Sequence, residues 1–231
     1  MSYKIISYMS RGYEPALRWV LPSWLRPEVE EILLVTDFVP DNLPAKVRVV
    51  AQYPASEDWL VNNCRRAEMA ARWLPDGQVA FLDLDCWILR DITEVFGPPG
   101  TIAVTRFWSK EAHTGGTITD GAFFANVNSA VRDFCREWDR RVKANPYTHT
   151  QVGAAVTNQY RFTELCREAY KTGKPAIVLT APEQLFNAEH SIRDALLAKC
   201  RQYAPSIVHL KGGQWKESRF VQQVLDACEG K

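Results

Sequence analysis

The sequence predicts an α/β protein in which helices flank a central, mixed but mostly parallel β-sheet. The first observation is that short apolar segments rich in branched residues alternate with longer amphipathic segments along the chain. The second is that apolar residues in the longer segments recur at helical spacing, whereas the short segments have the length of strands. Helices inserted between strands favour parallel pairing, so a layered α/β sheet is expected, mostly parallel in its first half.

Eight short apolar segments are expected to form the strands. They span residues 3–8, 31–36, 46–50, 78–84, 101–107, 122–127, 176–179 and 206–210. Branched and aromatic residues dominate them, as is typical of strands. In sheets of this kind ligands usually bind at the carboxyl ends of the strands, so the residues that follow each segment are the first candidates for function.

Three amphipathic segments are expected to form helices between and after these strands. Acidic residues in the first turn of segment 57–74 favour a helix N-terminus there. Ser129 is expected to cap a second helix, and a third helix is expected near the end of the chain. The apolar stripes of these last two helices are Val131, Phe134, Cys135, Trp138 and Val142, and Phe220, Val221, Val224, Leu225 and Cys228. No repeat or linker divides the chain, so residues 1–231 are expected to form one domain.

Composition excludes several classes of protein. The 231 residues are 46% hydrophobic and 24% charged, which is enough to bury a full core. Lys and Arg (28) nearly balance Asp and Glu (27), so no nucleic-acid partner is expected. No run is long and apolar enough for a signal peptide or a transmembrane segment, which predicts a cytoplasmic protein. The six cysteines lack the close spacing of zinc or redox motifs and are expected to be buried, reduced thiols.

Two carboxylates at the end of an apolar run carry most of the functional information. Residues 79–82 lead directly into Asp83 and Asp85, which would share one face of a continuing strand. Ionised acids this close repel each other unless a cation lies between them. Mg²⁺ and Mn²⁺ prefer oxygen ligands and are commonly held by one or two carboxylates together with substrate phosphates. The alternative is that the acids merely end the strand and either pair with Arg90 or cap a following turn.

The order Asp83-Leu84-Asp85, followed by residues 87–92, resembles the signature of GT-A glycosyltransferases, especially the family 8-like and related nucleotide-diphospho-sugar transferases. Four more segments are similar to that family: 119–126, Asn158 with Gln159, 182–187 and 209–216. The last of them resembles the family's closing His-x-x-Gly-x-x-Lys motif. Two features depart from the family pattern. Asn158 stands where the family usually has Asp, and the interval from His209 to Lys216 is one residue longer.

This resemblance implies a GT-A nucleotide-diphospho-sugar transferase fold and a hexosyltransferase activity. The donor would be a nucleotide-diphospho-sugar, in the first place a UDP-sugar, and the acceptor a hydroxyl of a carbohydrate, lipid-linked or protein molecule. The resemblance also implies a Mn²⁺ or Mg²⁺ site formed by Asp83, Asp85 and His209. Asp83 would in addition lie near the donor ribose, and Lys216 would contact the diphosphate.

Further candidates follow from their positions in the predicted sheet. Tyr8 and Asp37 end the first two strands, where an aromatic ring can stack on a base and a carboxylate can bind its edge or the ribose. Arg65, on the helix before the acids, is a further donor-binding candidate. Asp120 is a candidate base or sugar-binding residue, and Gln159 is a candidate for stabilising positive charge at the anomeric carbon. The alternative for each is an ordinary structural role.

Two other functions remain open from the sequence alone. A hydrophobic strand that ends in Asp-x-Asp also occurs in phosphatases of the haloacid-dehalogenase type, where the first acid is the nucleophile. A nucleotide-sugar-binding protein without turnover is the second alternative, because Asn158 and the spacing before Lys216 depart from the family pattern. Trp108 and Trp215 are additional candidates for the acceptor side of the site.

Overall fold

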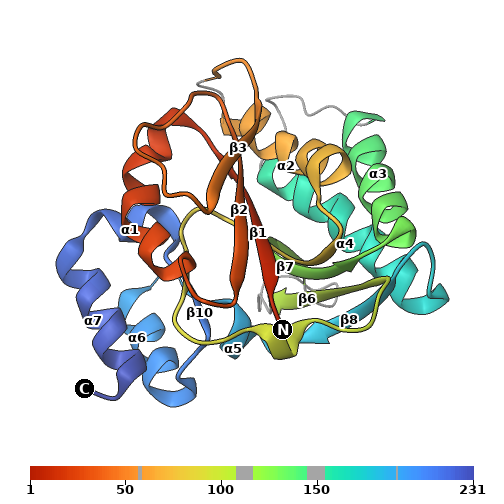
Figure 1. Cartoon of the computed structure of the whole chain (residues 1–231). Helices are drawn as coiled ribbons and strands as arrows, with labels where there is room; N and C mark the ends of the chain where they lie inside the picture. The colour runs from red at the N-terminus through yellow and green to blue at the C-terminus, as the bar shows by residue number, and fades with distance from the viewer. Residues whose placement is uncertain (57–58, 108–116, 145–153, 191) are drawn as a thin grey trace.

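A seven-stranded β-sheet with helices on both faces forms the centre of the molecule (Figure 1). The computed structural model describes residues 1–56, 59–107, 117–144, 154–190 and 192–231. The strand order is β3-β2-β1-β4-β7-β6-β8, and β7 runs antiparallel to its two neighbours while the other pairs are parallel. The strands are β1 (Tyr3–Met9), β2 (Val29–Thr36), β3 (Val47–Gln52), β4 (Gly77–Leu82), β6 (Thr101–Phe107), β7 (Thr117–Val127) and β8 (Ile177–Ala181). The predicted fold class is therefore confirmed.

Alternation along the strands gives the sheet two apolar faces, each covered by helices. Ile5 packs into one core together with α1 and the C-terminal helices, and the next residue, Ile6, packs into the other core with α2, α3 and α4. The helices are α1 (Glu14–Trp24), α2 (Trp59–Trp73), α3 (Ser129–Ala144), α4 (Ala154–Thr172), α5 (Glu183–Phe186), α6 (Arg193–Tyr203) and α7 (Ser218–Glu229), with short 3₁₀ turns η1 (Arg11–Tyr13), η2 (Thr93–Val95) and η3 (Lys211–Lys216). Among the helices in these described ranges, none is both long and apolar enough to cross a bilayer.

The three predicted helices correspond to α2, α3 and α7. The apolar stripe expected on α3, from Val131 to Val142, is buried as predicted. The predicted cap of α3 is wrong by one residue. Asn128 caps the helix, because its Oδ1 accepts a hydrogen bond from the backbone N–H of Val131 at 3.2 Å. Ser129 is the first helical residue instead.

The order of the parallel strands reverses between β1 and β4. From β1 the chain moves outward through β2 to β3, and it then returns to place β4 on the other side of β1. Connections therefore leave the carboxyl ends of β1 and β4 in opposite directions, which opens a crevice between the two strand ends. Ser10, Asp83 and Asp85 follow these two ends directly.

A second, three-stranded sheet connects the C-terminal part of the chain to the acidic residues. It consists of β5 (Cys86–Ile88), β10 (Ile207–His209) and β9 (Ala188–Glu189), in the order β5-β10-β9. His209 pairs with Cys86 on the antiparallel side and with Glu189 on the parallel side. This register brings residues that are more than a hundred positions apart to the end of β4.

Candidate active site

A pocket opens at the reversal of strand order, between the carboxyl ends of β1 and β4. Its cavity volume is about 160 Å³. The strand ends, α2 and the first 3₁₀ turn contribute its walls, which are Tyr8, Ser10, Tyr13, Asn62, Arg66, Asp83, Leu84 and Asp85. The pocket therefore combines both predicted acids with the predicted base-stacking tyrosine.

The two acids lie on a tight turn between β4 and β5. Strand β4 ends at Leu82, and the backbone N–H of Cys86 donates to the carbonyl of Asp83 at 3.0 Å, which closes the turn. The expectation that the acids share one face of a continuing strand is thus wrong, because the chain turns here to pair β5 with β10. The side chains converge nevertheless. His209 Nε2 is 2.9 Å from Asp85 Oδ1 and 3.6 Å from Asp83 Oδ2.

An arginine from α2 neutralises one of the acids. Arg66 forms an ion pair and hydrogen bond with Asp83, and both side chains line the pocket. Arg90, the partner considered from the sequence, instead donates to the backbone carbonyl of Cys228 at 3.1 Å. The acids are therefore oriented toward the pocket and toward His209, and Arg66 is positioned to meet an anionic ligand there.

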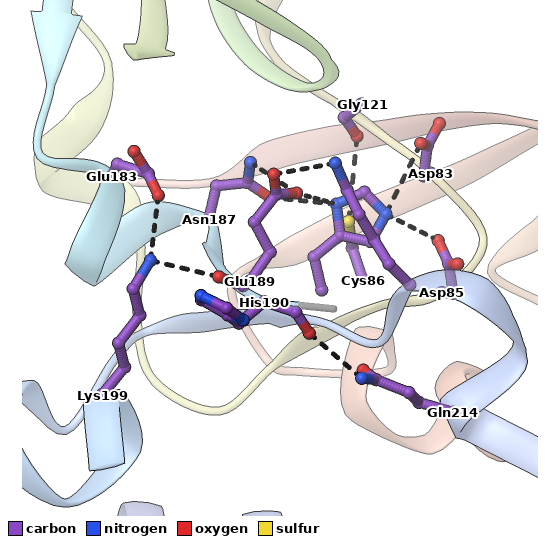
Figure 2. A network of polar contacts seen from close by, with 12 residues as sticks. Asp83, Asp85, Cys86, Gly121, Glu183, Asn187, Glu189, His190, Lys199 and Gln214 are labelled. Atoms are coloured by element: carbon purple, nitrogen blue, oxygen red, sulfur yellow. Dashed lines mark hydrogen bonds and ion pairs between the residues drawn. The ribbon is translucent and has the colours of Figure 1, made fainter. Parts of the chain in front are cut away.

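His209 occupies the buried side of the site. Its Nδ1 lies 3.1 Å from Glu189 Oε2 and 3.2 Å from Asn187 Oδ1, and Lys211 Nζ is 2.7 Å from the other Glu189 oxygen. Figure 2 shows Asp83 and Asp85 on one side of this contact network and Asn187 and Glu189 on the other. The imidazole thus lies between two sets of acceptors.

The charges around the imidazole reinforce one another. Burial lowers the pKa of His209, but its interactions with Cys86 and Asp85 raise that pKa well above the ordinary value. Burial likewise raises the pKa of Glu189, but its hydrogen bond and charge interaction with His209, together with Lys211, lower that pKa to about 2. The network therefore holds an ionised carboxylate beneath a strongly basic imidazole.

The donor atoms of this site suit a hard or borderline divalent cation. Two carboxylate oxygens and one imidazole nitrogen converge at the edge of an open pocket, and such a set leaves positions for phosphate oxygens. Gly121 of β7 leaves space for Asp83 and His209 to approach each other, because it has no side chain. A Cβ at this position would lie 2.6 Å from Asp83 Oδ2 and 2.9 Å from His209 Cε1. The predicted residues thus fit a Mn²⁺ or Mg²⁺ ion.

Cys86 adds a thiol beside the same imidazole. Asp85, Cys86 and His209 place potential ligand atoms within 4.8 Å of one another. Burial raises the pKa of the Cys86 thiol, and its Sγ lies 3.7 Å from the carbonyl of Gly121 as a donor. A protonated thiol is a poor ligand, so the two acids are better suited than Cys86 to complete the site with His209.

The nucleotide-binding candidates form a second polar group on the α2 side of the pocket. Tyr8 donates to Asn62 Oδ1 at 2.9 Å and accepts from Arg65 at 3.0 Å. Arg65 also donates to the carbonyl of Pro54 at 2.7 Å. Asp37 Oδ1 accepts from the backbone N–H of Arg11 at 2.8 Å and so joins the ends of β1 and β2. The structure places Tyr8 on the pocket wall, with its hydroxyl hydrogen-bonded to Arg65.

The remaining candidates are less closely associated with the pocket walls. Gln159 lies half-buried on α4, and Asn158 is buried beside it, where its carbonyl accepts from Trp138 at 3.1 Å. Lys216 is exposed on η3, with its Nζ 5.2 Å from the centre of the Trp215 ring. Asp120 is on β7 beside Gly121, but its side chain lies outside the described part of the structure.

The two tryptophan candidates also differ in outcome. Trp215 is only 4% exposed, so it packs in the core and does not present its ring as a sugar platform. Trp108 lies outside the described residues.

Sequence reasoning missed several residues of the site. Arg66 follows Arg65 on the helix before the acids, but no sequence pattern indicates its ion pair with Asp83, and Cys86 is predicted only as one of six buried thiols. No sequence pattern indicates that Asn187 and Glu189 face His209, or that Lys211 pairs with Glu189. Strands of two or three residues give little periodic signal, so the ladder that joins Glu189 to His209 was not predictable. Only the position of Cys86, directly after Asp85, was available as a signal.

Solved structures of glycosyltransferases share this fold. The galactosyltransferase LgtC, solved in complex with donor and acceptor sugar analogues, is 12% identical with a TM-score of 0.60, over 96% of this chain and 95% of that one. A glycosyltransferase involved in glycosylation of the major capsid of PBCV-1 is 13% identical with a TM-score of 0.56, over 96% and 99%. The glycosyltransferase GlyE of Streptococcus pneumoniae, in its apo form, is 11% identical with a TM-score of 0.56, over 90% and 54%.

These likenesses lie in the three-dimensional structure. No protein-family model and no curated protein matches the sequence. The chain nevertheless has the fold of these glycosyltransferases over nearly its whole length, which confirms the GT-A fold that the motifs suggested.

Proposed function

We propose that the chain is a metal-dependent glycosyltransferase that moves a hexose from a nucleotide-diphospho-sugar, in the first place a UDP-sugar, to an acceptor hydroxyl. One observation carries the proposal. Two carboxylates and an imidazole converge at a pocket that lies at the reversal of strand order in a glycosyltransferase fold. A pocket of this kind is where α/β sheets bind nucleotides.

In this proposal Asp83, Asp85 and His209 hold Mn²⁺ or Mg²⁺ at the pocket edge. A cation held by these residues would supply positive charge to the diphosphate leaving group. Arg66 already forms an ion pair with Asp83, and its guanidinium can contact a diphosphate oxygen while Asp83 faces the cation. The acids and Arg66 thus favour a ligand that carries both a metal and negative charge.

The nucleotide would lie along the α2 wall. Tyr8 is held by Asn62 and Arg65, so its ring is a fixed surface on which a base can stack. Asp37 and Arg65 are the proposed polar contacts to the base edge or ribose. Lys216 is the proposed contact to the diphosphate, and from its exposed place on η3 it would have to move away from the Trp215 ring.

Asp120 and Gln159 are the proposed residues of the chemical step. Asp120 directly precedes Gly121, whose carbonyl accepts from the Asp83 N–H at 2.7 Å and at which an added Cβ would meet Asp83 and His209, so the backbone of Asp120 is close to the proposed cation site. From there it would bind a sugar hydroxyl or accept the acceptor's proton. Gln159 would stabilise the positive charge that develops at the anomeric carbon.

We further propose that residues 1–231 form a single domain and that the protein resides in a reducing compartment. Both apolar cores share the seven-stranded sheet, which supports one domain over residues 1–231. All six cysteines are free thiols, which supports a cytoplasmic location. The acceptor is proposed only as a carbohydrate, lipid-linked or protein hydroxyl.

The test is a thermal-shift titration with nucleotides and nucleotide sugars, with and without Mn²⁺. UDP should stabilise the protein only when Mn²⁺ is present, by about 2.7 kcal/mol at a concentration 100 times its dissociation constant. Asp85→Ala should lose this shift. Asp76→Ala should keep it, because Asp76 is a surface acid, 79% exposed and paired with Arg132.

Activity assays with phosphate esters and nucleotide sugars, beside the thermal-shift titration, separate the alternatives. Hydrolysis of a generic phosphate ester would indicate a phosphatase of the haloacid-dehalogenase type. Metal-dependent donor binding without release or transfer of the sugar would indicate a binding protein. Absence of any Mn²⁺-dependent shift would contradict the proposed function itself.

A further inference from the structure

Glu189 is a buried acid behind the candidate site, and none of the roles described so far requires it. Its side chain is 1% exposed, and it lies on β9, a strand of only two residues. One carboxylate oxygen faces His209 Nδ1 at 3.1 Å and the other faces Lys211 Nζ at 2.7 Å. A carboxylate is costly to bury, and a chain could stabilise a two-residue strand more simply with an apolar side chain.

The contacts of Glu189 determine which nitrogen of His209 is available. Nδ1 faces two oxygen acceptors, one from Glu189 and one from Asn187. The amide nitrogen of Asn187 donates to Glu189 Oε2 at 3.4 Å, which leaves the amide oxygen to face the ring. Nδ1 must therefore carry a hydrogen. The opposite nitrogen, Nε2, is thereby directed at Asp83 and Asp85.

We propose that Glu189 is the positioning residue of the cation site, because it fixes the ring orientation and the tautomer in which His209 presents Nε2 to a divalent metal. This inference rests on the cation site of the proposed function. A carboxylate that accepts the second N–H of a metal-bound histidine orients the ring and increases its basicity. Lys211 stabilises the ionised form of Glu189 in its buried place, and Asn187 contributes a second acceptor.

The register of the small sheet supports this role. Glu189 is the residue paired with His209 across the parallel ladder, and Cys86, next to Asp85, is paired with it on the other side. The same three strands thus set the distance from the positioning carboxylate to the imidazole and from the imidazole to the acid turn. An acid that served only to stabilise the strands would not need to face the ring nitrogen opposite the proposed metal.

The test compares Mn²⁺ affinity in the full chain without nucleotide, by isothermal titration calorimetry. Glu189→Gln should weaken binding about 10-fold and Glu189→Leu up to about 100-fold, the usual range for loss of such a partner. In Glu189→Gln, the amide orientation that satisfies Lys211 turns an N–H toward Nδ1 and favours the wrong tautomer. Glu183→Gln is the matched control. Glu183 pairs with Lys199 at 3.2 Å in the same region, whereas the ring nitrogens of His209 face Asp83, Asp85, Asn187 and Glu189.

A second readout measures the tautomer directly. In ¹⁵N NMR spectra recorded without metal at alkaline pH, where the ring has lost its extra proton, the parent protein and Glu183→Gln should show hydrogen on Nδ1 of His209, whereas Glu189→Leu should shift hydrogen toward Nε2. A purely structural role would lower the melting temperature and leave the tautomer unchanged. If Glu189→Leu does not fold, Glu189→Gln decides the question.

The outcomes distinguish the two proposals. If the parent protein does not bind Mn²⁺, the proposed function fails. If the parent binds Mn²⁺ and both Glu189 variants bind it equally well with an unchanged tautomer, the positioning role of Glu189 is overturned while the cation site stands. Weaker binding in both variants with unchanged binding in Glu183→Gln supports it.

Discussion

The two sides of the candidate site are built in different ways. Asp83 and Asp85 lie on a turn at the pocket, with side chains 15% and 14% exposed, whereas His209 and Glu189 are 4% and 1% exposed between short strands. The acids can adjust to a ligand, because solvent and the pocket lie on one side of them. The imidazole cannot, because its ring is held from behind by Asn187 and Glu189. Changes on the acid side should therefore affect binding, and changes on the histidine side should affect both binding and stability.

Asp85→Ala is expected to have the largest effect on metal binding and a small effect on the fold. It removes one of the two carboxylates. The Asp85 side chain lies at the pocket and is 14% exposed, so its loss opens no enclosed cavity in the core. Mn²⁺ affinity should fall by more than about 100-fold, since loss of an outer partner alone costs up to that much. The free energy of unfolding should change by less than about 1 kcal/mol. Calorimetry with Mn²⁺ and urea unfolding measure the two quantities, and a large loss of stability would show that the turn is not independent of the core.

His209→Ala should combine weaker binding with a marked loss of stability. The substitution leaves Glu189 buried with Lys211 as its remaining charged partner, and breaking such a buried pair costs about 3 kcal/mol or more. The same two measurements apply. If His209→Ala unfolds at the urea concentration of the parent while Mn²⁺ affinity drops, the histidine side is as adaptable as the acid side, and the contrast between them is wrong.

This contrast also explains which parts were predictable from the sequence. The fold class, the strands of the large sheet and the acid pair follow from periodic patterns and from a motif of neighbouring residues. The turn at Asp83 to Asp85 did not follow, because the pairing of β5 with β10 depends on residues near the end of the chain. Nor did the partners of His209 follow, since Glu189 lies on a two-residue strand whose only signal is its tertiary contact.

The α2 side of the pocket, where the nucleotide is proposed to bind, was only partly predictable from the sequence. Tyr8 was predictable because it ends a clear strand, and the structure places it on the pocket wall. Arg66 was not, because charged residues off the apolar stripe of a helix are usually solvated, and only the packing of α2 beside the acid turn brings it to Asp83. Its neighbour Arg65, the sequence candidate, forms hydrogen bonds with Tyr8 and Pro54 instead.

Gly121→Ala tests the contact between the two sides. The added Cβ would lie 2.6 Å from Asp83 Oδ2 and 2.9 Å from His209 Cε1, so it would push the flexible acid away before it could displace the fixed imidazole. Overpacking of this kind costs about 1–3 kcal/mol of stability. We expect Mn²⁺ affinity to fall about 10-fold, comparable to the loss of an outer partner. Unchanged affinity would mean that Asp83 does not belong to the cation site, and the effect should then be confined to unfolding.

Asn128→Ala should have the smallest effect of these substitutions, and the effect should be confined to the free energy of unfolding. Asn128 caps α3 through the N–H of Val131 at 3.2 Å, and loss of such a cap costs about 1 kcal/mol. Helices α2, α3 and α4 cover the same face of the seven-stranded sheet. His209 and Glu189, by contrast, belong to the three-stranded sheet. A uniform loss of stability should therefore leave Mn²⁺ affinity unchanged. If this variant also binds Mn²⁺ more weakly, a decrease in global stability is sufficient to loosen the site, and the weaker binding of His209→Ala would no longer identify His209 as a ligand.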